Sequence, residues 1–182
     1  MEFVGIIGNN AVNSTNRTLL QYVQEHFKDR DKIILSEIKD IPAFTKPESH
    51  EAPEIVAKLS EQIVNADGVI IVTPEYDHSV PASLINVLEW LAYTTKPLQD
   101  KPVLILGASY GSLGTSRAQG HLRLMLNAPD LRARVLPGQE FLLGHALQSF
   151  DKNGRLVDQE QVKALEEHMT YFEKFASVNS VK

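Results

Sequence analysis

The stretch that decides the fold is residues 69–90, VIIVTPEYDHSVPASLINVLEW. It opens with β-branched apolar residues, as a buried strand does, and apolar residues at helical spacing follow Pro81. Between them lies a short loop that carries an aromatic ring, a carboxylate and two prolines. Such a loop at the carboxyl edge of an open α/β sheet indicates a ligand site. Because the prolines stiffen it, this loop suits a flat ring better than a flexible chain.

The same alternation of strand and helix runs along the whole chain. Short apolar runs that are typical of strands occur at residues 3–7, 32–38, 69–72, 103–106 and 131–136. Because these runs are nearly continuous and separated by helical segments, they predict a parallel sheet covered on both faces. We expect a three-layer α/β sandwich with a five-stranded parallel sheet of strand order 2-1-3-4-5. No linker divides the chain, so residues 1–182 are expected to form a single domain with a frayed tail at residues 177–182.

Composition excludes several classes of protein. The chain contains 43% hydrophobic and 23% charged residues, which is ordinary for a globular protein. It has no cysteine, which excludes disulfides, thiolate metal sites, cysteine nucleophiles and redox dithiols. A net charge of -5 argues against a nucleic-acid partner. No apolar run is long enough for a membrane span and no signal-peptide pattern opens the chain, so we expect a soluble cytoplasmic protein.

The first loop, residues 8–17, joins the first predicted strand to a helix and reads GNNAVNSTNR. Small and amide residues let its backbone turn tightly, and Ser14 and Asn16 offer hydrogen bonds beside the positive end of the helix. Such a loop can hold a phosphate without a lysine. Alternatively, Ser14 or Asn16 only caps the helix. The loop matches neither a Walker motif nor G-x-G-x-x-G.

Two further loops follow neighbouring strands. In the second loop, residues 73–79, Pro74 and the following Pro81 restrict the backbone, so its amides could present a constant pattern to a heterocycle. The alternative is that Tyr76 is only an aromatic residue at the rim. The third loop, residues 107–117, reads GASYGSLGTSR, and its three glycines allow a flat ligand to approach the backbone closely.

The third loop also matches G-x-S-x-G, the nucleophile-elbow pattern of serine hydrolases, with Ser109 as the nucleophile. A hydrolase needs an acid and a histidine on later loops, and little chain remains after Leu136 to supply them. The spacing of the histidines matches no metal-binding motif, so no metal site is predicted.

Together the three loops resemble the NADPH-dependent FMN reductase family, flavodoxin-like enzymes that include NAD(P)H quinone reductases, azoreductases and chromate reductases. The family's central motif is close to P-E-Y-N-x-S-x-P-x-x-L-K-N-x-x-D-W, and residues 74–90 read PEYDHSVPASLINVLEW. Residues 107–117 add G-x-S-x-G-x-x-G-x-x-R. The resemblance extends over residues 1–136 and implies a flavodoxin-like sandwich.

Carried over by position, the resemblance implies that three groups of residues surround FMN. The FMN phosphate would lie among Gly8, Asn9, Ser14, Thr15, Asn16 and Arg17. The flavin and its ribityl chain would lie against Pro74, Glu75, Tyr76, Asp77 and Ser79. The isoalloxazine would be approached from the third loop by Ser109, Tyr110, Gly111 and Gly114.

Three positions depart from the family pattern. In its phosphate loop, G-S-x-R-x-x-S-x-N, Asn9 replaces the serine and Ala11 the arginine, which removes a charge-assisted contact. The phosphate would then depend on backbone amides, Ser14, Asn16 and Arg17. Asp77 replaces the usual asparagine, so an acceptor-only group stands where an amide could also donate.

The resemblance implies an FMN-dependent NAD(P)H oxidoreductase with ping-pong kinetics. The nicotinamide of NADPH or NADH would pass hydride to flavin N5 and leave, and a small acceptor would take its place. Quinones, azo compounds, free flavin or metal oxyanions are the acceptors implied. Since the flavin carries the chemistry, no catalytic side chain is expected. Family members are commonly homodimers or homotetramers, which implies an oligomer here.

Three alternatives stay open at the level of sequence. One is a non-enzymatic FMN electron carrier like flavodoxin, against which the modest net charge argues. Another is a serine hydrolase that uses Ser109. The third is a family member that has lost FMN and acts as an interaction module, a hypothesis motivated by Ala11 in place of arginine.

Overall fold

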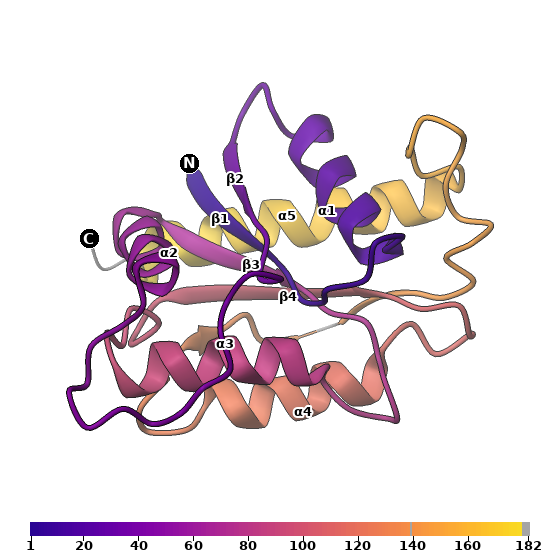
Figure 1. Cartoon of the computed structure of the whole chain (residues 1–182). Helices are drawn as coiled ribbons and strands as arrows, with labels where there is room; N and C mark the ends of the chain where they lie inside the picture. The colour runs from indigo at the N-terminus through magenta and orange to yellow at the C-terminus, as the bar shows by residue number, and fades with distance from the viewer. Residues whose placement is uncertain (139, 180–182) are drawn as a thin grey trace.

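Figure 1 shows the computed structural model of the chain, which describes residues 1–138 and 140–179. Strands and helices alternate along the chain in the order β1 (Glu2–Ile7), α1 (Thr15–His26), β2 (Lys32–Ser36), α2 (Glu54–Asn65), β3 (Gly68–Val72), α3 (Ala82–Tyr93), β4 (Pro102–Ala108), α4 (Ser116–Leu126), β5 (Arg134–Val135), β6 (Phe141–Leu143) and α5 (Gln159–Asn179). All strand pairs are parallel, and the sheet order is β2-β1-β3-β4-β5 with β6 also paired to β4. The predicted α/β sandwich and strand order are confirmed.

Side chains of each central strand point alternately into two separate cores. Val4 of β1 and Val69 of β3 pack with α2, α3 and α4, whereas Phe3 and Ile70 pack with α1 and α5. This alternation follows from the two-residue period of a strand. Because both faces are covered, as Figure 1 shows, the strands read as continuous apolar runs rather than alternating ones.

The fifth position of the sheet is filled by two short strands. β5 pairs with the first residues of β4, and β6 pairs with its last three residues. The sequence predicts one strand at residues 131–136, whereas only Arg134 and Val135 are paired there, and β6 was not expected. Pro137 and Gly138 separate the two pieces: proline has no N–H to donate to a ladder, and Gly138 has a φ of 105°.

The last helix extends further than expected. α5 continues through Ser177 to Asn179, so these residues do not fray as the sequence predicts. The rest of the predicted tail, residues 180–182, lies outside the described residues. Trp90 is buried and its indole Nε1 donates to the carbonyl of Pro42 at 2.8 Å, which confirms a packing role.

The order of the strands brings three loops together. β1 and β4 both lie beside β3, so the loops that follow β1, β3 and β4 leave the same edge of the sheet as neighbours. Between β1 and β3 the order of winding reverses, since β2 lies on one side and β4 on the other. Open α/β sheets bind ligands at such a switch point.

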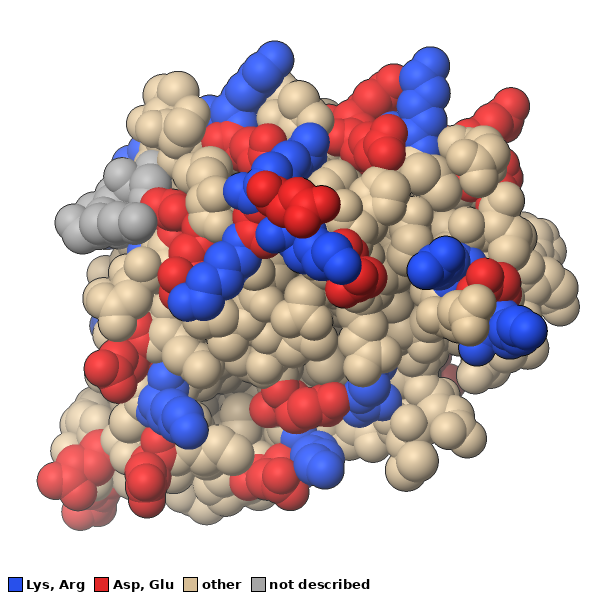
Figure 2. Space-filling view, turned by 90° about the horizontal axis from the view of Figure 1, so that it is seen from above, with Lys and Arg blue, Asp and Glu red and all other residues tan. Residues whose placement is uncertain are grey.

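Charges of both signs are interspersed on the face shown in Figure 2. The ion pairs among the described residues include Arg17 with Glu37 at 2.6 Å and Arg30 with Glu173 at 2.7 Å. Neither sign of charge dominates the face that is shown.

A carboxylate pair lies at the opposite edge of the sheet from the three loops. Glu173 of α5 lies beside the buried Asp31, with Arg30 and the amino group of Met1 as the cationic neighbours. Burial, followed by the hydrogen bond with Asp31 and its charge, raises the pKa of Glu173 from 4.5 to about 7. Glu173 therefore holds its proton in the folded state at a pH where the unfolded chain has lost it.

We predict that the free energy of unfolding decreases as the pH rises from about 4.5 to above 7. In this interval the folded state binds one more proton than the unfolded state, which contributes up to about 3 kcal/mol at the acidic end. Urea unfolding at several pH values measures it. Glu173→Gln should flatten the profile, whereas Glu167→Gln on an exposed face of α5 should not; equal profiles for both variants would contradict this.

Candidate functional site

The three loops enclose a cavity of about 470 Å³ at the carboxyl edge of the sheet. This volume is in the range of small-molecule and cofactor sites. Of the residues predicted to bind FMN, those that line the cavity are Asn9, Ser14, Thr15, Asn16, Pro74, Glu75, Tyr76, Ser109, Tyr110 and Gly111. The prediction that the three loops converge on one site is therefore confirmed.

The first loop is held by its own side chains. Ser14 is the N-cap of α1, and its hydroxyl oxygen accepts hydrogen bonds from the Arg17 amide at 3.2 Å and from Asn9 Nδ2 at 2.9 Å. The other end of the Asn9 side chain, Oδ1, accepts from the Ala11 amide at 3.1 Å. The capping role of Ser14 is thus confirmed. The first amides of α1 have no intrahelical partner, so they can still bind an anion.

Asn16 joins the first loop to the end of β4. Its Nδ2 donates to the carbonyl of Ala108 at 2.8 Å, and its Oδ1 accepts from the Ala108 amide at 2.9 Å. Asn16 is 2% exposed, so both bonds are buried. The side chain therefore uses its donor and its acceptor on the backbone of the third loop, which holds α1 and β4 together across the end of β3.

Two predicted FMN residues support the first loop without lining the cavity. The Arg17 guanidinium donates to both oxygens of Glu37, at 2.6 and 2.9 Å, and to the carbonyl of Ala11 at 2.8 Å. Gly8 lies where a Cβ would come within 2.6 Å of the carbonyl of Val72, so only glycine fits. Their predicted contact with the phosphate stays a prediction.

The second loop is a tight hairpin. The amide of Tyr76 donates to Ser79 at 3.1 Å, and the amide of Ser79 donates to Tyr76 at 2.9 Å. Between them, Asp77 and His78 have φ values of 49° and 63°. This left-handed pair corresponds to a type I′ turn, which favours Asn or Asp at its first central position. Asp77 therefore retains the turn that the family's asparagine would form.

Glu75 ties the second loop to α4. The N-cap of α4, Thr115, makes no side-chain capping bond and has a φ of 73°. Instead, the Glu75 carboxylate accepts from the amides of Arg117 and Ala118, at 3.0 and 3.2 Å, and Arg117 Nη1 adds an ion pair at 2.9 Å. Burial alone would raise the pKa of Glu75, but these hydrogen bonds hold it below 4.5.

The third loop provides backbone and aromatic surface rather than a nucleophile. The Ser109 hydroxyl donates to the carbonyl of Gly111 at 3.1 Å, and none of the described histidines is hydrogen-bonded to it. Tyr110 is 60% exposed at the cavity. Gly114 has a φ of 55°, and a Cβ there would meet Leu142, so glycine is required. The loop therefore lacks the base that a serine hydrolase needs.

Several residues that line the cavity were not predicted from the sequence. They are Ala11, Asn13, His78, Ala108, Leu113, Thr115 and Arg117. All lie within or next to the three loops, so proximity to the motifs was the available signal. Five predicted residues are not part of the lining, namely Gly8, Arg17, Asp77, Ser79 and Gly114. Direct contact between these five and FMN stays a prediction.

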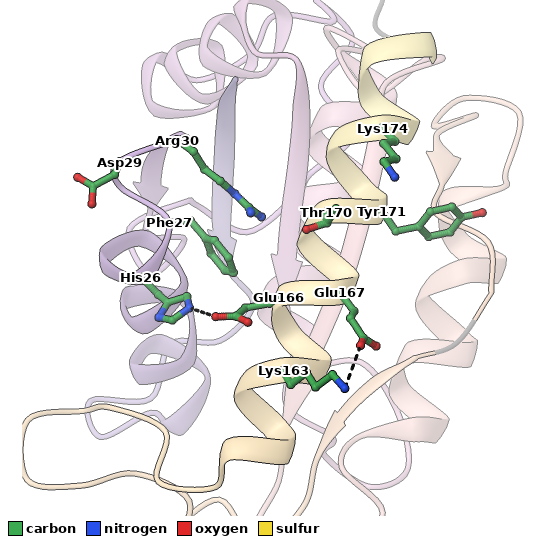
Figure 3. Close-up of a pocket in the computed structure, with 10 residues that line it drawn as sticks. All are labelled: His26, Phe27, Asp29, Arg30, Lys163, Glu166, Glu167, Thr170, Tyr171 and Lys174. Atoms are coloured by element: carbon green, nitrogen blue, oxygen red, sulfur yellow. Dashed lines mark hydrogen bonds and ion pairs between the residues drawn. The ribbon is translucent and has the colours of Figure 1, made fainter.

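A second cavity, of about 780 Å³, lies between α5 and the C-terminal end of α1 (Figure 3). Figure 3 shows His26 reaching Glu166 across it, at 2.8 Å, and Lys163 beside Glu167 at 4.0 Å. The charged side chains that line this second cavity are of opposite sign and neutralise one another. The cavity lies at the other end of α1 from Ser14. We assign no ligand to it.

Within residues 1–138 and 140–179, no group of three or more histidine and acidic side chains is arranged to hold a metal ion. Among the same residues, no helix combines the length and the apolar character that crossing a membrane requires.

Comparison with known proteins agrees with the loop geometry. Residues 1–148 match the family model for NADPH-dependent FMN reductase. The chain belongs to this family. Over 178 residues it is 48% identical to the NADH:(hydroxy)cinnamate reductase subunit CrdA of Vibrio ruber, covering 98% of this chain and 88% of that protein. It is 42% identical to the NADH-dependent flavin reductase subunit 2 of Lactobacillus johnsonii, covering 96% and 97%.

A solved structure supports the fold. The NAD(P)H:(acceptor) oxidoreductase FerB of Paracoccus denitrificans superposes with a TM-score of 0.88 over 99% of both chains, at 23% identity. Membership of the FMN reductase family confirms the prediction of an FMN-dependent NAD(P)H oxidoreductase. It also overrules the serine hydrolase alternative, in agreement with the hydrogen bonding of Ser109.

The cavity fits FMN in its chemistry. Hydroxyl, amide and helix N-terminal donors line one part, from Asn9 to Asn16, and suit a phosphate. Tyr76, Tyr110 and backbone from two loops line another part and suit a flat ring system. Gly111 has open space where a Cβ would lie, so its backbone is accessible to a ligand.

We predict that Asn16→Ala lowers the free energy of unfolding by about 2–4 kcal/mol, because it leaves a buried amide and carbonyl of Ala108 without partners. It should also weaken FMN binding, since the first and third loops are no longer joined. Urea unfolding and fluorescence titration with FMN measure the two effects. Asn10→Ala, a control substitution at an exposed position of the same loop, should change the free energy of unfolding by less than about 0.5 kcal/mol.

We predict that Glu75→Gln destabilises the protein by about 1–2 kcal/mol at pH 7, because α4 loses its charged cap. The folded pKa of Glu75 lies below 4.5, so its contribution is present above that pH and is lost as the pH falls through the folded value. The free energies of unfolding of the wild type and Glu75→Gln should therefore become equal in acid. Glu89→Gln, at an exposed position, serves as the matched control. A constant difference at every pH would contradict the cap.

Proposed function

We propose that this chain binds FMN in the cavity of the three loops, oxidises NADH, and delivers the electrons to a quinone or flavin acceptor. The observation that carries the proposal is the meeting of α1's N-terminus with the second and third loops around one cavity. The phosphate would lie at Ser14 and Thr15, and the isoalloxazine between the second and third loops. Bound FMN supplies two-electron chemistry by accepting and donating hydride.

In this site the protein would orient and enclose FMN rather than react with it. Ser14 and the first amides of α1 would hold the phosphate, with Arg17 fixing the loop from outside. The backbone hydrogen bonds of the hairpin from Tyr76 to Ser79 would fix the position of the second loop relative to the isoalloxazine ring. Tyr76 and Tyr110, which are 47% and 60% exposed, would leave room for a planar co-substrate beside it.

NADH is proposed as the donor because two relatives, at 48% and 42% identity, are named for NADH. Both are also named as reductase subunits, and a quinone reductase of Escherichia coli is 41% identical over 145 residues. We infer that the acceptor is a quinone or a flavin. We also propose that residues 1–182 act as one domain in the cytoplasm, where NADH is available, and that the chain assembles into a homodimer or homotetramer.

We predict that the purified protein binds FMN saturably, with quenching of flavin fluorescence, despite Ala11 in the first loop. NADH should bleach the bound flavin under anaerobic conditions faster than NADPH, and turnover with menadione should be sustained and ping-pong. Absence of saturable FMN binding would support the interaction-module alternative. Flavin binding with negligible NADH and NADPH oxidation would support the electron carrier.

A further inference from the structure

His78 is a cavity-lining imidazole that the chain does not use for its own structure. It lies at the third position of the hairpin, with a φ of 63°, and its side chain is exposed. The hairpin is closed by backbone bonds between Tyr76 and Ser79, so it does not need the His78 ring. Among the described residues no hydrogen bond or ion pair engages that ring. It is therefore available to a ligand.

The other titratable groups that line the cavity cannot readily give up a proton near neutral pH. Glu75 is ionised and bound by Arg117 and two amides, and its pKa is held below 4.5. The remaining titratable residues of the lining are Tyr76, Tyr110 and Arg117. Phenol and guanidinium groups are in general much weaker acids than an imidazolium. Imidazole is the side chain that titrates near neutrality.

Nearby histidines do not compete for this position. His121 of α4 is hydrogen-bonded through Nδ1 to Ser79 at 2.8 Å and is not part of the cavity lining. His145 follows β6 with a φ of 50°, and its amide donates to the carbonyl of Gly111 at 3.0 Å, but it too lies outside the lining. Among the described residues, His78 is thus the histidine placed to face a substrate in this cavity.

We propose that His78 is the proton donor to quinone-type acceptors in the oxidoreductase reaction proposed above. Reduction of a quinone to a hydroquinone requires two electrons and two protons. Bound FMN would supply two electrons and one proton as hydride, so the other quinone oxygen would need a proton from a second donor. The His78 imidazolium gives its Nε2 proton to that oxygen and is reprotonated from water. General acid catalysis of this kind requires an imidazole that is protonated at the working pH.

The experiment compares His78→Asn with His145→Asn. Both positions have left-handed backbone, which asparagine tolerates well, so the two substitutions are matched in strain. Each variant is loaded with FMN and assayed from pH 5.5 to 8.5 with NADH and two acceptors. Menadione takes up protons on reduction, whereas ferricyanide takes up electrons alone and needs no acid.

The wild type should reduce menadione more slowly as the pH rises through the imidazole range. His78→Asn should lose this pH dependence, and at pH 6 it should turn over menadione at least about tenfold more slowly than the wild type. Its turnover with ferricyanide and the reduction of its flavin by NADH should be unchanged. His145→Asn should behave as wild type for both acceptors. An equal loss with menadione and ferricyanide, or no loss with either, overturns the role of His78.

A second measurement does not depend on turnover. In the oxidised FMN-loaded protein, menadione should shift the ring resonances of His78 in a histidine NMR spectrum and leave those of His145 in place. Binding of menadione without a shift at His78 overturns the proposal even if a variant fails to bind FMN. Failure of the proposed function has a different signature, because the wild type would then show no NADH-dependent ferricyanide reduction.

Discussion

The buried pair of hydrogen bonds between Asn16 and Ala108 is the interaction on which the site depends. It joins the first turn of α1 to the end of β4, across the end of β3 that lies between them. Without it, the first and third loops would be separate surface turns, each free to move by itself. With it, the loops form the walls of one cavity, since an unpaired amide and carbonyl at this depth would be costly.

Glu75 extends the same principle to the second loop. A carboxylate from the loop after β3 caps the helix after β4, so the hairpin and α4 share one hydrogen-bond network. The three loops are thus connected before any ligand arrives, and a flavin would meet walls that are already ordered. Preorganisation of this kind reduces the entropy that is lost on binding.

The residues around the cavity divide into supports and contacts. Gly8, Arg17 and Gly114 fit the backbone together or anchor a loop from outside, and Asp77 holds the left-handed turn of the hairpin. Ser14, Tyr76 and Tyr110 face the cavity itself. A motif that resembles a family's binding loop therefore contains both kinds of residue, and a one-dimensional pattern cannot separate them.

The parallel sheet, its strand order and the convergence of the three loops could be predicted from the amino-acid pattern alone. Hydrophobic periodicity is a local signal, and the rules of α/β topology hold for open parallel sheets in general. The pattern set the bounds of β5 too wide and missed β6, because pairing with β4 outweighs a weak local preference there. Nor could it show that Asn16 binds Ala108, that Arg17 turns to Glu37, or that Glu75 caps α4. Those partners lie 92, 20 and 42 or 43 positions apart, and only folding decides which side chain satisfies which distant backbone group.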